Sequence, residues 1–226
     1  MNDRNRGRAR VKICGLRDAA TIRAMDGLEV DEIGFVFAKS RRQVEPEAAA
    51  ELIAEVKQLK TPQGEAPKTV GVFVGAALEG LRELLAVAPL DVVQLHGDED
   101  PALCSAVRGE LGKEVWKVFS VHGDDAAGTG HERLLAFEGT IDAALIDTAG
   151  GGTGQTFGWD AIPRYAAAAK EINVPLYVAG GLHPDNAAEL LGNYEVDGVD
   201  VSSGVETDGV KDIEKIRAFV ERVKAR

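Results

Sequence analysis

The chain has 226 residues, of which 45% are hydrophobic and 28% charged, and its formal net charge is −11. This length and composition suit a globular chain with enough apolar side chains for one large domain core. The acidic excess argues against a protein that holds nucleic acid or an anionic membrane mainly through charge, although a few local donors can still bind a small anion.

Strand and helix patterns alternate along the chain. Strands are predicted at residues 10–14, 32–37, 69–74, 92–95, 115–118, 143–147, 176–179 and 198–201. Helices are predicted at residues 18–26, 46–59, 78–87, 101–111, 131–137, 159–170, 184–191 and 212–225. Pro46 and Pro184 suit a first helical position, and Asp100 is placed to cap the helix that begins at Pro101. Residues 123–130, rich in Gly and Asp, are predicted to form a loop.

Eight strand–helix pairs in a chain of this length predict one (β/α)8 barrel. A doubly wound open sheet is the alternative, but it would normally carry a G-x-G-x-x-G turn after its first strand, and the sequence Cys14-Gly15-Leu16-Arg17 follows here. No linker divides the chain. We therefore expect a basic, flexible tail over residues 1–9 and a single barrel domain over residues 10–226.

The location follows from the cysteines and from missing targeting signals. Cys14 and Cys104 are too few for a disulfide framework, which favours a reducing, cytoplasmic setting. No run of about 18 apolar residues could span a membrane, and the basic N-terminus lacks the apolar stretch of a signal peptide. We expect a cytoplasmic protein with neither a membrane nor a nucleic acid as partner.

In a barrel of this kind, functional residues gather at the carboxyl ends of the strands. Because side chains at i and i+2 of a strand share a face, Arg10, Lys12 and Cys14 should point into the barrel, opposite Val11 and Ile13. Asp200 and Ser202 share a face of the last strand in the same way. Since a closed barrel makes its first and last strands neighbours, we predict that Lys12 pairs with Asp200.

Cys14 is either a small buried hydrophobic residue or a nucleophile or general base. Its ordinary pKa is about 8.5, so only a few per cent is thiolate near neutrality, and a neighbouring cation such as Lys12 would raise that fraction. Cys104, in the middle of a predicted helix, is expected in the core.

Asp147 ends an apolar strand and precedes a segment, residues 148–158, that contains five glycines. Such a segment is typical of a lid over a ligand, although an irregular loop is the alternative. Beneath a lid, Asp147 could act as a general acid if partial burial raised its pKa.

The turns after the last two strands contain Gly180 and Gly181, and Ser202, Ser203 and Gly204. Glycine turns at these two strands are the usual phosphate site of the barrel, because backbone N–H groups can approach an anion there. Arg42 could bind a carboxylate or phosphate, or it could be a solvated loop cation. His96 is expected to be structural. The histidines lack metal-ligand spacing, so no metal site is expected.

Several segments resemble the phosphoribosylanthranilate isomerase family. They are residues 11–15 (VKICG), 34–37 (GFVF) with 40–44 (SRRQV), 70–74 (VGVFV), 93–97 (VQLHG), 145–148 (LIDT), 151–157 (GGTGQTF), 179–182 (AGGL) with 184–186 (PDN), and 200–206 (DVSSGVE). The motifs occur in order from Val11 to the last helix. Together they are far more specific than any one of them.

The resemblance implies an isomerase of tryptophan biosynthesis that needs no cofactor and acts on a phosphorylated small molecule. It would convert N-(5-phosphoribosyl)anthranilate into 1-(2-carboxyphenylamino)-1-deoxyribulose 5-phosphate by an Amadori rearrangement. By position, Asp147 would be the general acid, Cys14 the general base and Arg42 the partner of the anthranilate carboxylate. Gly180, Gly181, Asp200, Ser202, Ser203 and Gly204 would bind substrate, mainly its phosphate. Such barrels occur as monomers and homodimers.

Two other functions remain open at this stage. One is another sugar-phosphate isomerase or epimerase on the same phosphate-binding barrel. The other is a non-catalytic barrel that binds a phosphorylated ligand, for which ligand affinity would not depend on Cys14.

Overall fold

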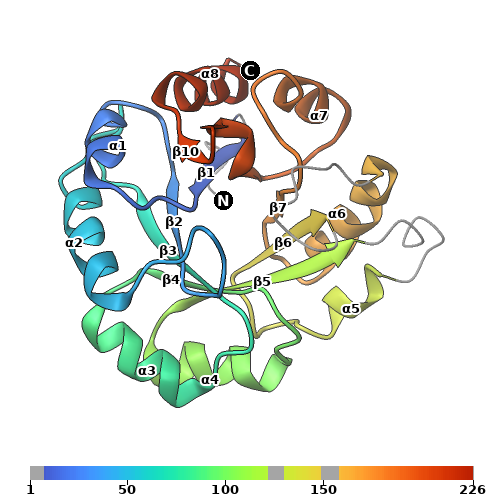
Figure 1. Ribbon diagram of the computed structural model, residues 1–226. Helices are drawn as coiled ribbons and strands as arrows, with labels where there is room; N and C mark the ends of the chain where they lie inside the picture. Colours follow the sequence, from blue (N-terminus) through green and yellow to red (C-terminus); the bar gives the residue numbers. More distant parts are fainter. Residues whose placement is uncertain (1–7, 122–129, 149–157, 226) are drawn as a thin grey trace.

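The computed structural model describes residues 8–121, 130–148 and 158–225. Eight parallel strands form a closed barrel in the order of the chain, and β1 pairs with β8 to close it (Figure 1). The strands are β1 (Arg10–Cys14), β2 (Glu32–Val36), β3 (Lys68–Phe73), β4 (Val92–Leu95), β5 (Glu114–Val121), β6 (Ala143–Thr148), β7 (Leu176–Val178) and β8 (Gly198–Val201). The predicted (β/α)8 barrel is confirmed.

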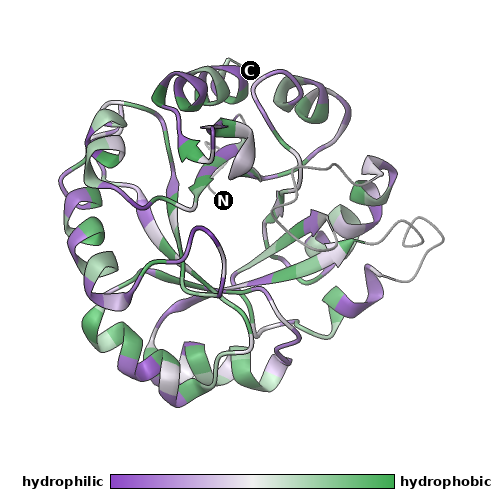
Figure 2. Cartoon of the chain, in the orientation of Figure 1, coloured by the Kyte–Doolittle hydropathy of each residue, from purple (hydrophilic) through white to green (hydrophobic). Residues whose placement is uncertain are grey.

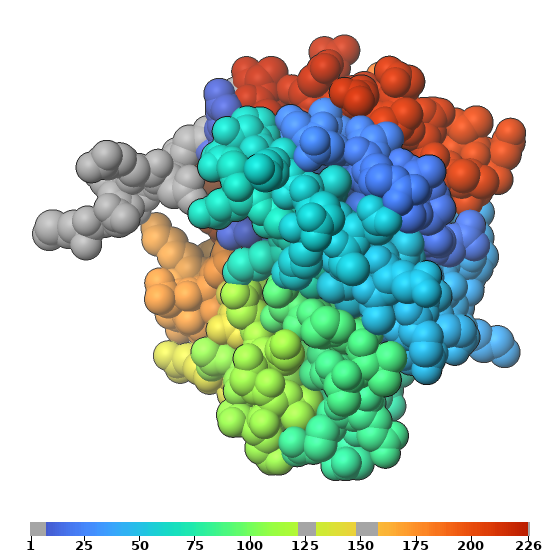
Figure 3. Space-filling view, turned by 90° about the vertical axis from the view of Figure 1, so that its left-hand side faces the viewer, coloured from blue at the N-terminus to red at the C-terminus, as the bar shows by residue number. Residues whose placement is uncertain are grey.

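Helices follow each strand and form a ring outside the barrel (Figure 1). They are α1 (Ala19–Ala24), α2 (Pro46–Val56), α3 (Leu78–Val87), α4 (Pro101–Leu111), α5 (Glu132–Leu135), α6 (Ile162–Glu171), α7 (Ala187–Asn193) and α8 (Ile213–Lys224). Seen from the side, the segments of α1, α2 and α3 lie over one face of the molecule (Figure 3). None of the helices in the described ranges is long and apolar enough to cross a membrane.

Two apolar layers hold the barrel together. One lies between strands and helices and contains Val11 and Ile13 together with helix residues such as Ile53 and Phe219. The other fills the barrel and is formed by Val70, Val92, Trp116, Val118, Ala143, Leu145, Tyr177 and Ala179. The strands are largely hydrophobic, whereas hydrophobic and hydrophilic segments alternate along the outer helices (Figure 2). Strand parity thus separates the two layers as the sequence predicts.

Several helix starts follow the capping chemistry of the sequence. Asp100 accepts a hydrogen bond from the backbone N–H of Leu103, and Pro101 and Pro46 occupy first turns as expected. The prediction for Pro184 is wrong, since α7 begins three residues later at Ala187. Asn186 explains the delay, because its side chain accepts from the N–H of His183 and donates to the carbonyl of Gly181. These bonds hold residues 183–186 as a turn.

Other boundaries differ more modestly. The predicted helix at residues 159–170 is a short 3-10 turn, η2 (Trp159–Ala161), followed by α6. Strand β5 is longer than predicted and continues to Val121. Most of the predicted loop at 123–130 and of the predicted lid at 148–158 lies outside the described residues, as does most of the predicted tail at 1–9.

A small hairpin between β8 and α8 was not predicted. After the 3-10 turn η3 (Ser203–Val205), strands β9 (Glu206–Thr207) and β10 (Val210–Lys211) pair antiparallel. Asp208 and Gly209 join them with φ angles of 52° and 79°. An Asp-Gly pair between two strands is a strong signal for a two-residue hairpin with positive φ, so the sequence did contain the information.

Candidate active site

Lys12 and Asp200 form a buried ion pair inside the barrel. They are register partners on β1 and β8, and Lys12 Nζ lies 3.0 Å from Asp200 Oδ2. The Lys12 side chain is fully buried, and the Asp200 side chain is nearly so. The predicted pairing is therefore confirmed. It places a cation and an anion directly beneath the end of β1.

Cys14 ends β1 next to this pair and is itself buried. Its register partner on β2 is Gly34, where a Cβ atom would lie 2.9 Å from the Cys14 Sγ. Burial raises the pKa of the Cys14 thiol, and the nearby charge of Lys12 opposes that rise without cancelling it. Lys12 acts in the direction that the sequence predicted, but desolvation outweighs it, so the pKa of the thiol is raised overall.

Arg42 reaches the same end of the barrel from the loop between β2 and α2. A Cβ atom on Gly15 would lie only 2.6 Å from Arg42 Cδ, so the aliphatic stem of Arg42 packs directly over the residue that follows Cys14. Gly15 also has a φ of 82°, which disfavours any other residue there. Arg42 is 8% exposed, whereas the Arg41 side chain is 59% exposed. The loop therefore buries one arginine and leaves its neighbour at the surface.

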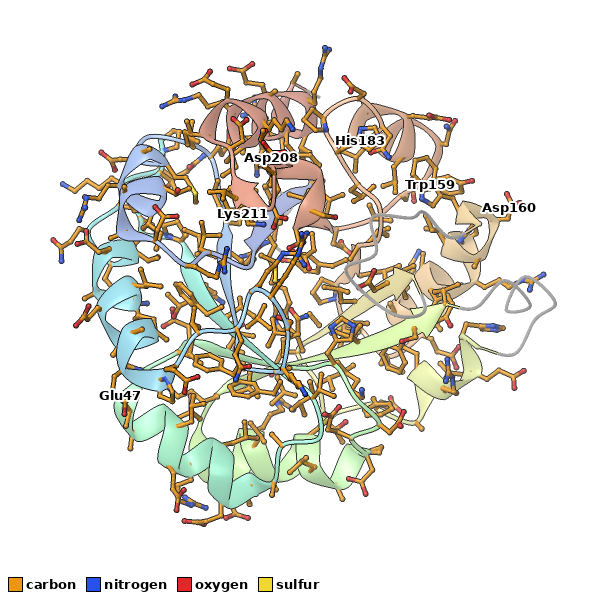
Figure 4. All side chains as sticks on the ribbon, in the orientation of Figure 1. Glu47, Trp159, Asp160, His183, Asp208 and Lys211 are labelled. Atoms are coloured by element: carbon orange, nitrogen blue, oxygen red, sulfur yellow. The ribbon has the colours of Figure 1, made fainter. Side chains whose placement is uncertain are left out.

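Glu206, on the unpredicted hairpin, binds both arginines and a lysine. Arg42 donates to it with Nε at 2.7 Å and Nη2 at 3.0 Å, and Lys211 Nζ lies 2.9 Å from it. Burial alone would raise the pKa of Glu206, but hydrogen bonds from Arg42 and Lys211 outweigh it and lower that pKa to about 2. Lys211 lies inside the ring of helices near β1, whereas Glu47 lies out at the ring (Figure 4).

Asp147 lies at the carboxyl end of β6 and is 6% exposed. His96, which follows β4, has its Nε2 3.7 Å from Asp147 Oδ2. Burial and the charge of Lys12 lower the pKa of His96 to about 4. His96 is therefore neutral near pH 7, and its contact with Asp147 is polar rather than ionic.

The turns after β7 and β8 pack closely on each other. Gly180 and Gly181 have φ angles of 89° and 65°, which glycine adopts readily. A Cβ atom on Gly204 would lie 1.8 Å from the carbonyl oxygen of Leu182. The Ser202 hydroxyl donates to the carbonyl of Cys14 at 3.1 Å, which ties the β8 turn to the end of β1. Ser203 begins η3 beside it.

The positions of the candidate residues fall into two groups. Cys14, Arg42, Asp200 and Ser202 lie together around the ends of β1 and β8, and Asp147 lies with His96 at the ends of β6 and β4. Cys104 is buried in α4, as expected for a core residue. No group of three or more His, Cys, Asp or Glu residues that could hold a metal ion occurs within the described ranges.

Comparison with known proteins identifies the family. A family model described as N-(5'phosphoribosyl)anthranilate (PRA) isomerase matches residues 11–222. The chain belongs to the PRA isomerase family. The N-(5'-phosphoribosyl)anthranilate isomerase of Brevibacillus brevis is 44% identical over 220 residues, which are 96% of this chain and 94% of that protein.

Solved PRA isomerase structures share the fold of this chain. Monomers generated from the dimeric enzyme of Thermotoga maritima superpose with a TM-score of 0.77 at 31% identity, covering 96% of this chain and all of that one. A PRA isomerase in complex with reduced 1-(o-carboxyphenylamino)-1-deoxyribulose 5-phosphate also gives a TM-score of 0.77, at 30% identity and the same coverage. The resemblance inferred from the sequence is thus confirmed.

Proposed function

We propose that this chain carries out the reaction of its family, with Cys14 as general base and Asp147 as general acid. It converts N-(5-phosphoribosyl)anthranilate into 1-(2-carboxyphenylamino)-1-deoxyribulose 5-phosphate, a step of tryptophan biosynthesis in the cytoplasm. The observation that carries the proposal is the arrangement of the barrel mouth. A buried thiol ends β1, a buried carboxyl lies at the end of β6, three strands away around the barrel, and the stem of a buried arginine lies over Gly15, the residue after β1.

The first chemical step assigned to Asp147 is protonation of the furanose ring oxygen. The C1–O bond breaks, the nitrogen lone pair forms a C=N bond, and the ring opens to a protonated Schiff base. The position of Asp147, buried at the carboxyl end of β6, supports this role, because the functional residues of such a barrel gather at that end.

The second step requires a base at C2 of the opened sugar. The Cys14 thiolate removes the C2 proton, the C1–C2 double bond forms, and the iminium nitrogen accepts the electrons to give an enolamine. Tautomerisation of the enol then gives the ketone. Because the substrate's own iminium accepts the electrons, the step requires no cofactor. Lys12 supports it by favouring the thiolate, against the burial that opposes it.

Binding of the anthranilate carboxylate is assigned to Arg42. The buried position of Arg42 beside Cys14 supports this choice over the exposed Arg41. A guanidinium removed from water interacts more strongly with a carboxylate than a solvated one does. Its place over Gly15 would put the aromatic end of the substrate near the base that acts on C2.

Binding of the phosphate is assigned to the turns after β7 and β8, which contain Gly180, Gly181, Ser202, Ser203 and Gly204. The positive φ angles of Gly180 and Gly181 and the close packing of Gly204 on Leu182 support the assignment, because backbone N–H groups in such turns can converge on an anion. Asp200 belongs to the floor of the site, where its contact with Lys12 supports an electrostatic role beneath the sugar.

The direct test is turnover by the wild-type protein. Substrate is generated in place from anthranilate and phosphoribosyl pyrophosphate by the preceding transferase, and loss of its anthranilate fluorescence is followed. We expect loss that is proportional to the concentration of this chain. A folded protein that binds the substrate and leaves its fluorescence unchanged would instead indicate a binding barrel.

A further inference from the structure

Glu206 is a buried carboxylate shared by three cations. Its side chain is 4% exposed and accepts from Arg42, Lys211 and Arg41, the last through Nη2 at 2.9 Å. One negative charge thus faces three positive ones in a chain whose net charge is −11. Two of these cations, Arg42 and Lys211, are buried, and such a local excess of positive charge suits a site that receives an anion.

The contact between Arg42 and Glu206 fixes the plane of the guanidinium. Nε and Nη2 of Arg42 bind the two carboxylate oxygens of Glu206 side by side, which is the bidentate geometry that leaves little rotational freedom. The stem of Arg42 is held at the same time by Gly15. Within the described part of the chain, Nη1 makes no hydrogen bond. The edge of the Arg42 guanidinium that carries Nε and Nη2 is therefore bound by Glu206, and Nη1 is available to a ligand.

Glu206 is itself held firmly. It begins β9, its backbone carbonyl accepts from Lys215 Nζ at 2.7 Å, and Lys211 binds both its carboxylate and the carbonyl of Ser202. Through these contacts the hairpin after β8 connects the β8 turn with the loop after β2. A displacement of Glu206 would therefore be transmitted to Arg42.

We propose that Glu206 is a positioning residue, which holds the Arg42 guanidinium in the plane that receives the anthranilate carboxylate. The inference rests on the proposed function, and it assigns Glu206 a role in substrate recognition that is distinct from acid–base chemistry. A preoriented guanidinium loses less freedom on binding, so removal of Glu206 should weaken binding more than it slows the chemical step.

A role in charge balance alone makes the opposite prediction. If Glu206 only neutralised its neighbours, its removal would make the mouth more positive and would leave anion binding unchanged or tighter. Glu206→Gln separates the two roles, because the amide removes the charge and replaces one acceptor oxygen with a donor that faces Arg42. We expect KM to rise about tenfold or more while kcat changes by less than about threefold.

Glu32→Gln is the matched control, since it neutralises another buried glutamate, at the first residue of β2 and therefore at the opposite end of the barrel. Its KM should equal that of the wild type.

An unchanged or lower KM in folded Glu206→Gln would overturn the proposal. Should that variant fail to fold by circular dichroism, Glu206→Asp keeps the charge and shortens the reach, and we expect a smaller but measurable rise in KM. A wild-type KM in Glu206→Asp would then count against the proposal.

A double-mutant cycle tests whether Glu206 affects ligand binding through Arg42. We expect that Glu206→Gln added to Arg42→Ala weakens binding of reduced 1-(o-carboxyphenylamino)-1-deoxyribulose 5-phosphate, an analogue of the product, by less than about twofold beyond Arg42→Ala alone. Full additivity would show that Glu206 acts independently of Arg42 and would refute the positioning role. If the wild type lacks turnover, the proposed function fails. If the wild type turns over substrate and Glu206→Gln has an unchanged KM, only the positioning role of Glu206 is refuted.

Discussion

At the residue scale, Cys14 shows how burial and charge compete. Strand parity correctly placed Lys12 and Asp200 on one face, because the alternation of side chains along a strand is local and certain. The sequence left the net direction of the Cys14 pKa open, since the cost of desolvation depends on every segment packed around the thiol. Strand parity thus predicts which charged residues lie near Cys14, whereas the net shift of its pKa requires the packed structure.

The raised pKa of Cys14 has a consequence for pH dependence. If the thiolate is the base, kcat/KM should rise with pH through neutrality, and the inflection should lie above the ordinary thiol pKa of about 8.5. Lys12→Met removes the cation that favours the thiolate and leaves Asp200, which disfavours it. We expect the inflection to move upward by about one pH unit or more.

The pH–rate profile of each variant is the measurement. Lys224→Met is a suitable control, because Lys224 is a largely buried lysine at the end of α8 that pairs with Asp31, away from Cys14. Should Lys12→Met alone unfold, the additional change Asp200→Asn removes the unpaired buried charge. If the inflection of the profile stays at the wild-type pH in a folded Lys12 variant, Lys12 does not influence the pKa of the catalytic base.

At the scale of elements, most of the barrel was predictable from the sequence. Strands β1, β4 and β8 and helices α3 and α4 have the predicted bounds, because buried strands and amphipathic helices have strong local signals. The start of α7 was not predictable from Pro184, since the bonds of Asn186 to residues 181 and 183 decide it. The β9–β10 hairpin has two-residue strands, too short for a periodicity signal, and only its Asp-Gly turn marks it.

The same limit applies to the site. Cys14, Asp147 and Arg42 could be proposed from strand ends and family motifs. Gly15 and Gly34 could not be given their roles, because the need for glycine comes from Arg42 and Cys14 packing against them across the fold. Glu206 was likewise missed as the partner of Arg42, since this contact spans 164 residues of sequence.

Gly204 tests the coupling of the β7 and β8 turns. In Gly204→Ala the new methyl group would meet backbone atoms of Leu182 and His183, which cannot rotate away. We expect a loss of about 1–3 kcal/mol in the free energy of unfolding, as for an overpacked core. We also expect KM to rise about tenfold because the two turns must separate.

Urea denaturation and steady-state kinetics measure both effects. Gly109→Ala is the matched control, since Gly109 lies within α4 and a Cβ atom there has no neighbour within 4 Å. It should stabilise the protein by about 0.5–1 kcal/mol and leave KM unchanged. A Gly204→Ala variant with wild-type KM and stability would contradict the described packing of the turns.

At the scale of the whole molecule, the amino end of β2 contains a titratable group to which the proposed reaction assigns no role. Glu32 is fully buried, pairs with Arg10 and accepts a hydrogen bond from Tyr177 at 3.1 Å. Burial raises the pKa of Glu32 from 4.5 to about 7, although Arg10 opposes the shift. The folded protein thus binds this proton more tightly than the unfolded chain does.

The raised pKa of Glu32 in the folded protein makes the free energy of unfolding depend on pH. The contribution of Glu32 is fully present below pH 4.5 and is lost as the pH rises through about 7. Glu32→Gln stays neutral, so relative to the wild type it should gain about 1–3 kcal/mol in the free energy of unfolding between pH 5 and pH 8. The Arg10 side chain is 40% exposed, so water can solvate its guanidinium when Glu32 is replaced by a neutral residue.

Urea denaturation of both proteins at pH 5 and pH 8 makes the comparison. A difference between variant and wild type that is independent of pH would show that Glu32 does not titrate in this range in the folded state. Activity serves as the internal control, because this end of the barrel lies opposite the proposed site.

The proposed reaction depends most on Cys14 as its general base and Asp147 as its general acid. Turnover of Cys14→Ala and Asp147→Asn beside the wild type tests this most directly, with circular dichroism to verify that each variant is folded. We expect kcat/KM to fall by about 10²–10⁴-fold in each variant while the reduced product analogue still binds. Wild-type turnover by folded Cys14→Ala or Asp147→Asn would contradict the assigned chemistry.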